Sequence, residues 1–212
     1  MKSKNILAIV SMLALSAPMA SAGETDWYAG VGGGRSSFNG NELALEPTRL
    51  ASETYTLNNL ETVGTGWKLF AGRMLNENWA VEVAYTKLGR FWFDANILAG
   101  PGPGPFPTNE IAEAKPDCWS LSGVGFYPLG NNFSLLGKAG ICKWADHALG
   151  YEGGISYNLE AYSEGYSLTY GIGAKYEFTD KLGVRAEWER FEKVVHKQDS
   201  VDLISISLQY GF

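Results

Sequence analysis

The sequence has little of what a metalloenzyme or a membrane-spanning helix needs. Its 212 residues include two histidines and two cysteines, and their spacing matches no zinc module. After residue 22 no run of eighteen apolar residues occurs, which excludes a transmembrane helix. Helix-type patterning is nearly absent. Basic residues number 17 against 23 acidic ones, and this acidic balance argues against nucleic-acid binding.

The first 22 residues are typical of a secretory signal peptide. Two lysines precede an apolar run from Ile6 to Leu15, and the small residues Ala20 and Ala22 follow it. This order is that of an export signal, and the apolar run is too short to span a membrane. A buried N-terminal helix is the alternative that this pattern disfavours. We therefore expect cleavage after Ala22, export, and one mature domain at 23–212 with 15 basic and 23 acidic residues.

The mature sequence alternates between apolar and polar residues, as β-strands do. In the last segment Ile204, Ile206 and Leu208 fall on one face, and Ser205 and Ser207 fall on the other. Glycine is abundant at 26 residues and aromatic residues make up 13%, which favours a β-barrel over a helical domain. The eight predicted strands are 26–38, 63–75, 79–89, 117–129, 133–145, 164–178, 181–193 and 200–212.

The connections between these strands alternate in length. The tight turns "NEN", "GNN" and "TD" join three strand pairs, and long segments occur at 39–62, 90–116 and 146–163, with a short one near 194–199. This plan predicts an all-β fold: an eight-stranded antiparallel transmembrane up-and-down β-barrel with short periplasmic turns and long extracellular loops.

Two glycine-rich segments have plain structural interpretations. The run "AGPGPGPFP" at 99–107 cannot join a sheet, because proline lacks the donor N–H. It is either an exposed tether, which we favour, or a polyproline-type recognition segment. The run "GVGGG" at 30–34 has no helix after it and is therefore no phosphate loop. Its glycines are expected to let the strand bend around the barrel.

Alternation also assigns the faces of the strands. Apolar residues fall on the side expected to meet lipid, aromatic residues such as Trp79, Trp119 and Tyr127 lie near strand ends as interfacial belts do, and charges fall on the lumen side. A soluble sandwich would bury the apolar side instead. The predicted lumen ion-pair network comprises Lys68, Glu82, Lys138, Lys175, Glu177, Arg185, Glu187 and Glu189. These residues either plug the lumen, which we favour, or form a gate in which Glu82 exchanges cation partners.

The two cysteines are expected to form a disulfide in an exported protein. Cys118 and Cys142 are each twelve residues from Gly130 in a turn, so a regular hairpin places them opposite each other, facing inward at the outer rim. Trp144 shares this inward parity. Because that is unusual for tryptophan, a bulge near it is an open alternative.

The two histidines are the candidates for chemistry. His147 and His196 lie at the predicted outer rim, where barrel lipid hydrolases keep Ser-His sites, but nothing singles out a serine partner. We therefore predict no catalytic residue, no metal site and no cofactor.

Several segments of the chain resemble the OmpA-like transmembrane β-barrel family. They are "DWYAGVGGG", "GTGWKLFAGRMLNENWAVEVAYTKLG", "LLGKAGICKWAD", "YGIGAKYEFTDKLGVRAEWERF" and the terminal "SLQYGF". The resemblance implies a bacterial outer-membrane barrel, delivered by periplasmic chaperones and inserted by the barrel-assembly machinery. Tyr210 and Phe212 match the family's terminal assembly signal. Glu82, Lys138, Arg185 and Glu187 match its internal charge network.

Two features depart from the family pattern, the cysteine pair and the Gly-Pro run. In addition, no peptidoglycan-binding domain follows the barrel in this sequence, so a cell-wall tether is not expected.

Three functions follow as expectations. The first is a monomer that supports the outer membrane, contacts its lipid and lipopolysaccharide, and displays loops to host surfaces or phage. The second is a narrow, low-conductance channel gated by Glu82 and Arg185. The third is a lipid-modifying enzyme that uses His147 or His196.

Overall fold

The computed structural model describes the backbone of residues 27–39, 54–99, 108–152, 161–195 and 199–212. Side chains are described at 27–38, 61–92, 113–146, 163–194 and 199–212. The expected signal peptide and residues 100–107 of the Gly-Pro run lie outside these ranges. Among the described residues, no helix is long and apolar enough to cross a membrane.

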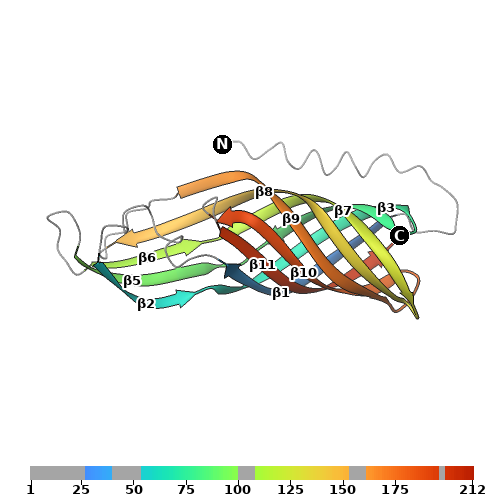
Figure 1. The fold of residues 1–212 in the computed structure, drawn as a ribbon, viewed down its shortest axis with the longest axis horizontal. Helices are drawn as coiled ribbons and strands as arrows, with labels where there is room; N and C mark the ends of the chain where they lie inside the picture. The colour runs from blue at the N-terminus through green and yellow to red at the C-terminus, as the bar shows by residue number, and fades with distance from the viewer. Residues whose placement is uncertain (1–26, 40–53, 100–107, 153–160, 196–198) are drawn as a thin grey trace.

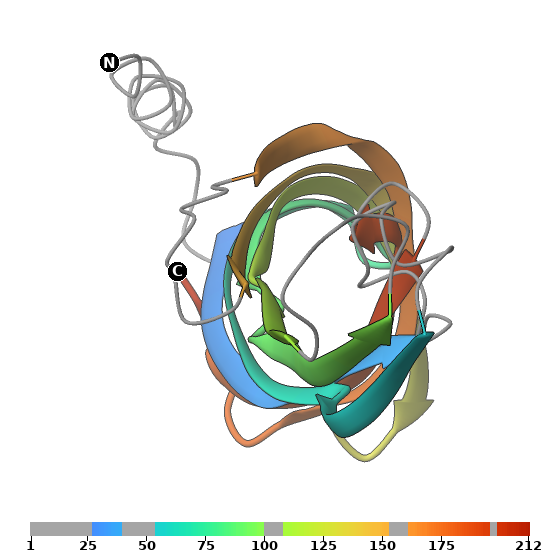
Figure 2. The same ribbon diagram turned by 90° about the vertical axis from the view of Figure 1, so that its left-hand side faces the viewer.

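Eight antiparallel strands close into a barrel, as predicted (Figures 1 and 2). Around the ring the strands follow the order β8-β7-β4-β3-β1-β11-β10-β9, and pairing of β8 with β9 closes it. The eight are β1 (Trp27–Asn39), β3 (Val63–Asn76), β4 (Trp79–Lys87), β7 (Pro116–Gly130), β8 (Phe133–Glu152), β9 (Ala161–Glu177), β10 (Leu182–Val195) and β11 (Asp199–Gly211).

The barrel has a turn end and a loop end. Short turns join β3 to β4, β7 to β8 and β9 to β10 at the turn end, where β1 begins and β11 ends. There the N–H of Phe212 donates to the carbonyl oxygen of Trp27 at 3.0 Å, and the N–H of Gly211 donates to that of Lys181 at 2.7 Å. The last residue is therefore fixed into the wall rather than left as a frayed tail.

The outer surface is apolar, as the alternation predicts. Ile204, Ile206 and Leu208 of β11 are 54–66% exposed, whereas Ser205 and Ser207 between them are buried. Aromatic residues border this apolar band at both ends, which is the pattern of interfacial belts. The turn-end belt comprises Trp27, Trp79, Tyr127, Phe133, Tyr176, Phe178, Tyr210 and Phe212. The loop-end belt comprises Trp67, Tyr85, Trp119, Tyr166, Tyr170 and Trp188.

Three further strands extend the sheet beyond the loop end. They are β2 (Thr54–Glu61), which leads into β3, β5 (Phe91–Ala99), which follows β4, and β6 (Thr108–Ala114), which leads into β7. They pair in the order β2-β5-β6 and then with Leu149–Glu152 of β8, which makes a projecting four-stranded sheet (Figure 1). We call it the extension sheet.

The extension sheet corrects the prediction that 39–62, 90–116 and 146–163 are long loops. Much of each segment is strand, because the barrel strands below hold their continuations side by side and so supply pairing partners beyond the barrel. The break between β4 and β5 falls at 88–90, where Gly89 takes a left-handed conformation with φ of 99°.

Candidate functional site

Six charged side chains meet in the middle of the lumen, three cations and three carboxylates. They come from four strands and are at most 3% exposed. The formal charges cancel, so no net charge is buried. The lumen cluster consists of Lys68 on β3, Glu82 on β4, Lys138 on β8, and Arg185, Glu187 and Glu189 on β10.

Arg185 lies at the centre of the lumen cluster. One guanidinium nitrogen donates to Glu82 at 2.7 Å, and the other donates to Glu187 at 2.7 Å. Two neutral groups also contact this ion pair. Arg185 donates to the amide oxygen of Gln209 at 3.4 Å, and the hydroxyl of Tyr28 donates to Glu82 at 3.1 Å. With Lys138 on β8, which donates to it at 3.4 Å, Glu82 therefore accepts from groups on three different strands.

Two lysines bind the remaining carboxylates. Lys68 donates to Glu187 at 2.5 Å and also to Glu189. Lys138 donates to Glu189 and lies 3.4 Å from Glu82 and 3.7 Å from Glu187. Each carboxylate thus has at least two cation partners, which makes the cluster one connected network.

Two of the eight predicted network residues do not join the lumen cluster. Lys175 and Glu177 pair with each other at 2.9 Å near the turn end, where the Glu177 side chain is 41% exposed. The Lys175 ammonium lies 5.5 Å from the ring centre of Phe126. The sequence places both residues on the lumen face, but their height along the barrel separates them from the other six.

Apolar residues close the lumen on both sides of the lumen cluster. The turn-end core comprises Tyr28, Phe70, Ala80, Ala84, Val124, Phe126 and Leu136. The loop-end core comprises Phe38, Leu88, Phe91, Ala114, Cys118, Cys142, Trp144, Phe191, Val194, Val201 and Leu203. The ring of Phe70 joins the turn-end core to the charges, since the Arg185 guanidinium lies 4.6 Å from its centre. The lumen is therefore filled in three layers, apolar, ionic and apolar.

Glycines of β1 make room for this filling. A Cβ atom on Gly30 would lie 2.2 Å from Phe70, and one on Gly34 would lie 1.9 Å from the carbonyl oxygen of Ile204. The "GVGGG" run thus allows close approach of side chains and of the neighbouring strand.

The cysteines form the predicted disulfide inside the loop-end core, with a Cα–Cα distance of 5.8 Å. The prediction that they are directly opposed is wrong. Cys118 faces Trp144 and Cys142 faces Ser120, so the bond is diagonal across β7 and β8. The register is regular around Trp144, and the irregularity lies instead between Pro128 and Gly130, beside the turn.

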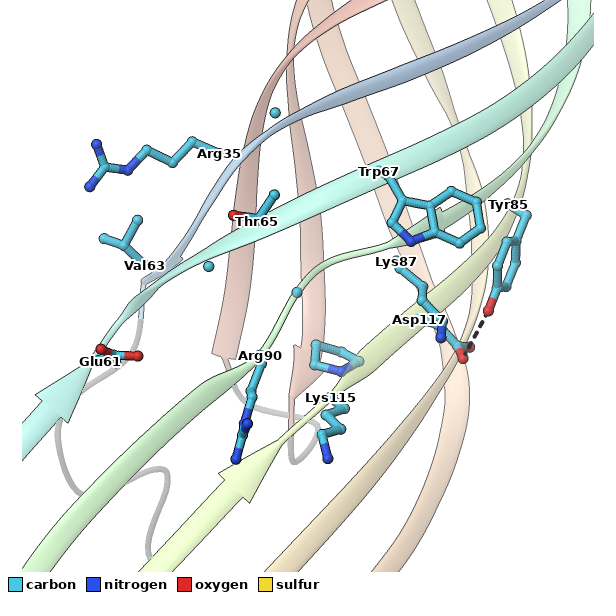
Figure 3. Close-up of a pocket in the computed structure, with 14 residues that line it drawn as sticks. Arg35, Glu61, Val63, Thr65, Trp67, Tyr85, Lys87, Arg90, Lys115 and Asp117 are labelled. Carbon is cyan, nitrogen blue, oxygen red and sulfur yellow. Dashed lines mark hydrogen bonds between the residues drawn. The ribbon is translucent and has the colours of Figure 1, made fainter.

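A groove lies on the outside of the barrel at the loop end. Its volume is about 980 Å³, and β1, β3, β4 and the start of β7 line it, above Trp67 and Tyr85 of the loop-end belt. Figure 3 shows four cations spread around it: Arg35, Lys87, Arg90 and Lys115. The groove was not predicted from the sequence. The pattern in the sequence that could have predicted it is a set of outward-facing cations just beyond the aromatic residues of neighbouring strands.

The two histidines are the residues predicted as candidates for a hydrolase site. The side chain of His147, in β8, and all of His196 lie outside the described residues. Within the described part of the chain, no three His, Cys, Asp or Glu side chains gather where a metal ion could bind.

The sequence matches the OmpA-like transmembrane domain family over residues 22–212. The chain belongs to this family. Membership agrees with the closed barrel, the two aromatic belts and the buried charges. The loop end of the barrel corresponds to the extracellular side, and the turn end corresponds to the periplasmic side. No curated protein matches the chain.

Several solved structures are similar to this OmpA-like protein at low sequence identity. Neisserial surface protein A is 11% identical with a TM-score of 0.54, covering 90% of this chain and all of that one. The N-terminal barrel of Pseudomonas aeruginosa OprF is 10% identical with a TM-score of 0.50, covering 89% and 100%. Yersinia pestis Ail, solved with the heparin analogue sucrose octasulfate, is 13% identical with a TM-score of 0.48, covering 88% and 99%.

Proposed function

We propose that this OmpA-like protein is a closed outer-membrane barrel that supports the membrane and holds the extension sheet at the cell surface for interaction with other molecules. The proposal that the barrel is closed rests on the three-layer filling of the lumen. Water or solute would have to displace two apolar cores and separate a charge-balanced network, each of which is costly in a low-dielectric interior.

The extension sheet supports the second half. It projects beyond the loop end, on the far side of the belt that marks the membrane boundary. Within the described residues, β2 pairs with β5 on one side and with no strand on the other. An open strand edge offers backbone donors and acceptors to an extended peptide of a partner protein. A binding role without catalysis is the function we infer.

A narrow channel is the second candidate. The buried hydroxyls of Ser122, Thr169, Ser205 and Ser207 have no hydrogen-bond partner among the described residues, and a few waters would satisfy them. Glu82 and Lys138 lie 3.4 Å apart, so exchange of ion-pair partners needs only small movements. The apolar cores at both ends weigh against continuous conduction.

One experiment separates the two candidates. The mature chain, 23–212, is refolded, checked by its altered migration when unboiled, and inserted into planar bilayers. A silent bilayer for wild type supports the closed barrel. Discrete openings that change in Glu82→Ala or Arg185→Ala would instead make it a channel.

The display role is tested by shortening the extension. Replacing 93–112 with an Asn-Gly turn keeps Phe91 and Ala114 of the loop-end core. Cells carrying this variant should keep a folded barrel and lose attachment to host-cell surfaces or phage. Attachment equal to that of wild type would overturn the role of the extension sheet.

A further inference from the structure

The groove on the outside of the barrel, which we call the outer groove, places cations next to the membrane boundary. Trp67 and Tyr85 lie 5.6 Å apart between ring centres, and Tyr85 and Trp119 lie 4.9 Å apart, so an aromatic ladder crosses β3, β4 and β7. The apolar band lies on one side of this ladder and the groove on the other. A ligand in the groove is therefore at the height of lipid headgroups in the outer leaflet.

The charges of the groove are positive on balance. Arg90 and Lys115 both pair with the buried carboxylate of Glu113, Lys115 at 3.0 Å, so two cations share one anion. Neither Arg35 nor Lys87 makes an ion pair within the described residues. Four cations and two carboxylates thus line the groove, in a chain whose formal net charge is −6. The buried carboxylates of Glu113 and Asp146 lie beside Lys115, and Asp146 accepts from the backbone N–H of Lys115 at 3.1 Å.

The two carboxylates that line the groove itself have other contacts. Asp117 accepts from the hydroxyl of Tyr85 at 3.3 Å and lies opposite Lys87 in the strand register. Glu61 accepts from the indole N–H of Trp92 at 2.5 Å. These contacts hold both anions at the groove wall, and Arg35 extends away from them (Figure 3).

We propose that the groove binds an outer-leaflet lipid whose headgroup bears more than one phosphate. The cations are spread around the groove rather than gathered at one point (Figure 3), which suits an extended polyanionic headgroup better than a single inorganic phosphate. Guanidinium groups bind phosphate oxygens in pairs, and lysine adds a point charge. The acyl chains of the same lipid lie along the aromatic ladder and the apolar band below it.

The test is native mass spectrometry of the refolded mature chain, released from detergent micelles that contain one of three lipids. The lipids are diphosphoryl lipid A, monophosphoryl lipid A and phosphatidylcholine. We expect a saturable adduct with the diphosphoryl lipid, weaker binding of the monophosphoryl lipid, and none above background with phosphatidylcholine. Equal binding of all three would overturn the proposal.

Charge variants locate the site. Arg35→Gln and Lys87→Gln should each weaken binding of diphosphoryl lipid A by about fivefold, the effect of one cation near an anionic surface. Lys193→Gln makes the same charge change at the loop end of β10, on another side of the barrel, and should bind as wild type does. Equal losses in all three variants would indicate unspecific charge attraction and overturn the site.

Inorganic phosphate distinguishes a lipid site from a phosphate site. At 10 mM it should leave the lipid adduct in place, because it lacks the acyl chains and the second phosphate. Complete displacement would identify a simple phosphate site and overturn the lipid proposal. All three variants change exposed side chains, and unboiled migration on a denaturing gel checks that each barrel is folded.

Discussion

Arg185 and Glu82 are 103 residues apart in sequence and form a 2.7 Å ion pair at the centre of the barrel. Both side chains are at most 1% exposed. The pair joins β10 to β4 across the lumen, whereas backbone hydrogen bonds join only neighbouring strands. Removal of either residue therefore tests how much of the barrel's stability comes from its interior rather than from its wall.

Glu82→Ala should destabilise the barrel by about 3–5 kcal/mol, because Arg185 and Lys138 each lose a buried counter-charge. Urea unfolding in lipid vesicles measures the free energy of unfolding. Glu77→Ala, in an exposed turn, is the control and should change it by less than about 0.5 kcal/mol. Glu82→Ala combined with Arg185→Ala restores the charge balance, so its cost should be smaller than the sum of the single variants. Additive costs would show that the two side chains do not interact.

The disulfide should resist reduction in the folded barrel. Both cysteines are fully buried in the loop-end core, and exchange requires access to a sulfur. Treatment with dithiothreitol followed by a maleimide should label neither Cys118 nor Cys142 until urea is added. Cys118→Ala together with Cys142→Ala should lower the free energy of unfolding by about 3 kcal/mol, since the bond closes a loop with a sequence separation of 24. Rapid labelling of folded protein would mean that the loop-end core opens.

Gly34→Ala should impair refolding. Its added methyl group would lie 1.9 Å from the Ile204 carbonyl oxygen, a backbone atom that cannot rotate away, and overpacking of this kind costs about 1–3 kcal/mol. Gly123→Ala is the matched control on β7, where nothing lies within 4 Å of the added atom. The fraction of protein that migrates as folded on an unboiled gel compares the two. Equal folded fractions would contradict this account of the β1–β11 contact.

Phe212→Ala should separate folding from assembly. The rings of Tyr210 and Phe212 are exposed on the turn-end belt, 6.5 Å apart, where the barrel-assembly machinery is expected to read them. Refolding in vitro should be nearly unchanged, while the amount assembled in living cells should fall severalfold. Phe178→Ala changes another exposed aromatic residue at the same end and should reach normal amounts. Similar losses in both variants would assign the effect to the belt rather than to the terminus.

Alternation, the glycine and aromatic content and the alternating lengths of the connections together predicted the closed barrel. Alternation also predicted the inward direction of residues such as Lys68 and Arg185, because a period of two fixes the face of a strand. It does not fix height along the barrel, which depends on how the strands are staggered. For that reason Lys175 and Glu177 share the predicted face and yet lie outside the lumen cluster.

The pairing register of β7 and β8 shows a second limit of prediction from the sequence. Counting from Gly130 assumes a turn centred there, whereas the turn residues are Asn131 and Asn132, with φ of 51° and 67°, the signs of a type I′ turn. A bulge at Leu129 then moves the pairing back by one residue. The two effects together place Cys118 opposite Trp144.

The outer groove and the extension sheet show a third limit of prediction from the sequence. Arg35 lies on β1, Lys87 on β4, and Lys115 between β6 and β7. These segments are far apart in sequence, so the proximity of the three cations follows only from the order of strands around the ring. The segment "FWFDANILA" lacks strict alternation, and it becomes a strand because its neighbours are already held in place.

Phe91 and Ala114 are the residues at which the extension sheet is rooted, and both belong to the core that closes the barrel mouth. The packing of the loop-end core, which closes the lumen, therefore also anchors the extension sheet. Changes in the hairpin between these two residues leave both root residues in place, so the fold separates a packed root from the part of the hairpin above it. Foreign peptides grafted between 93 and 112 should accordingly be carried to the cell surface on an unchanged barrel.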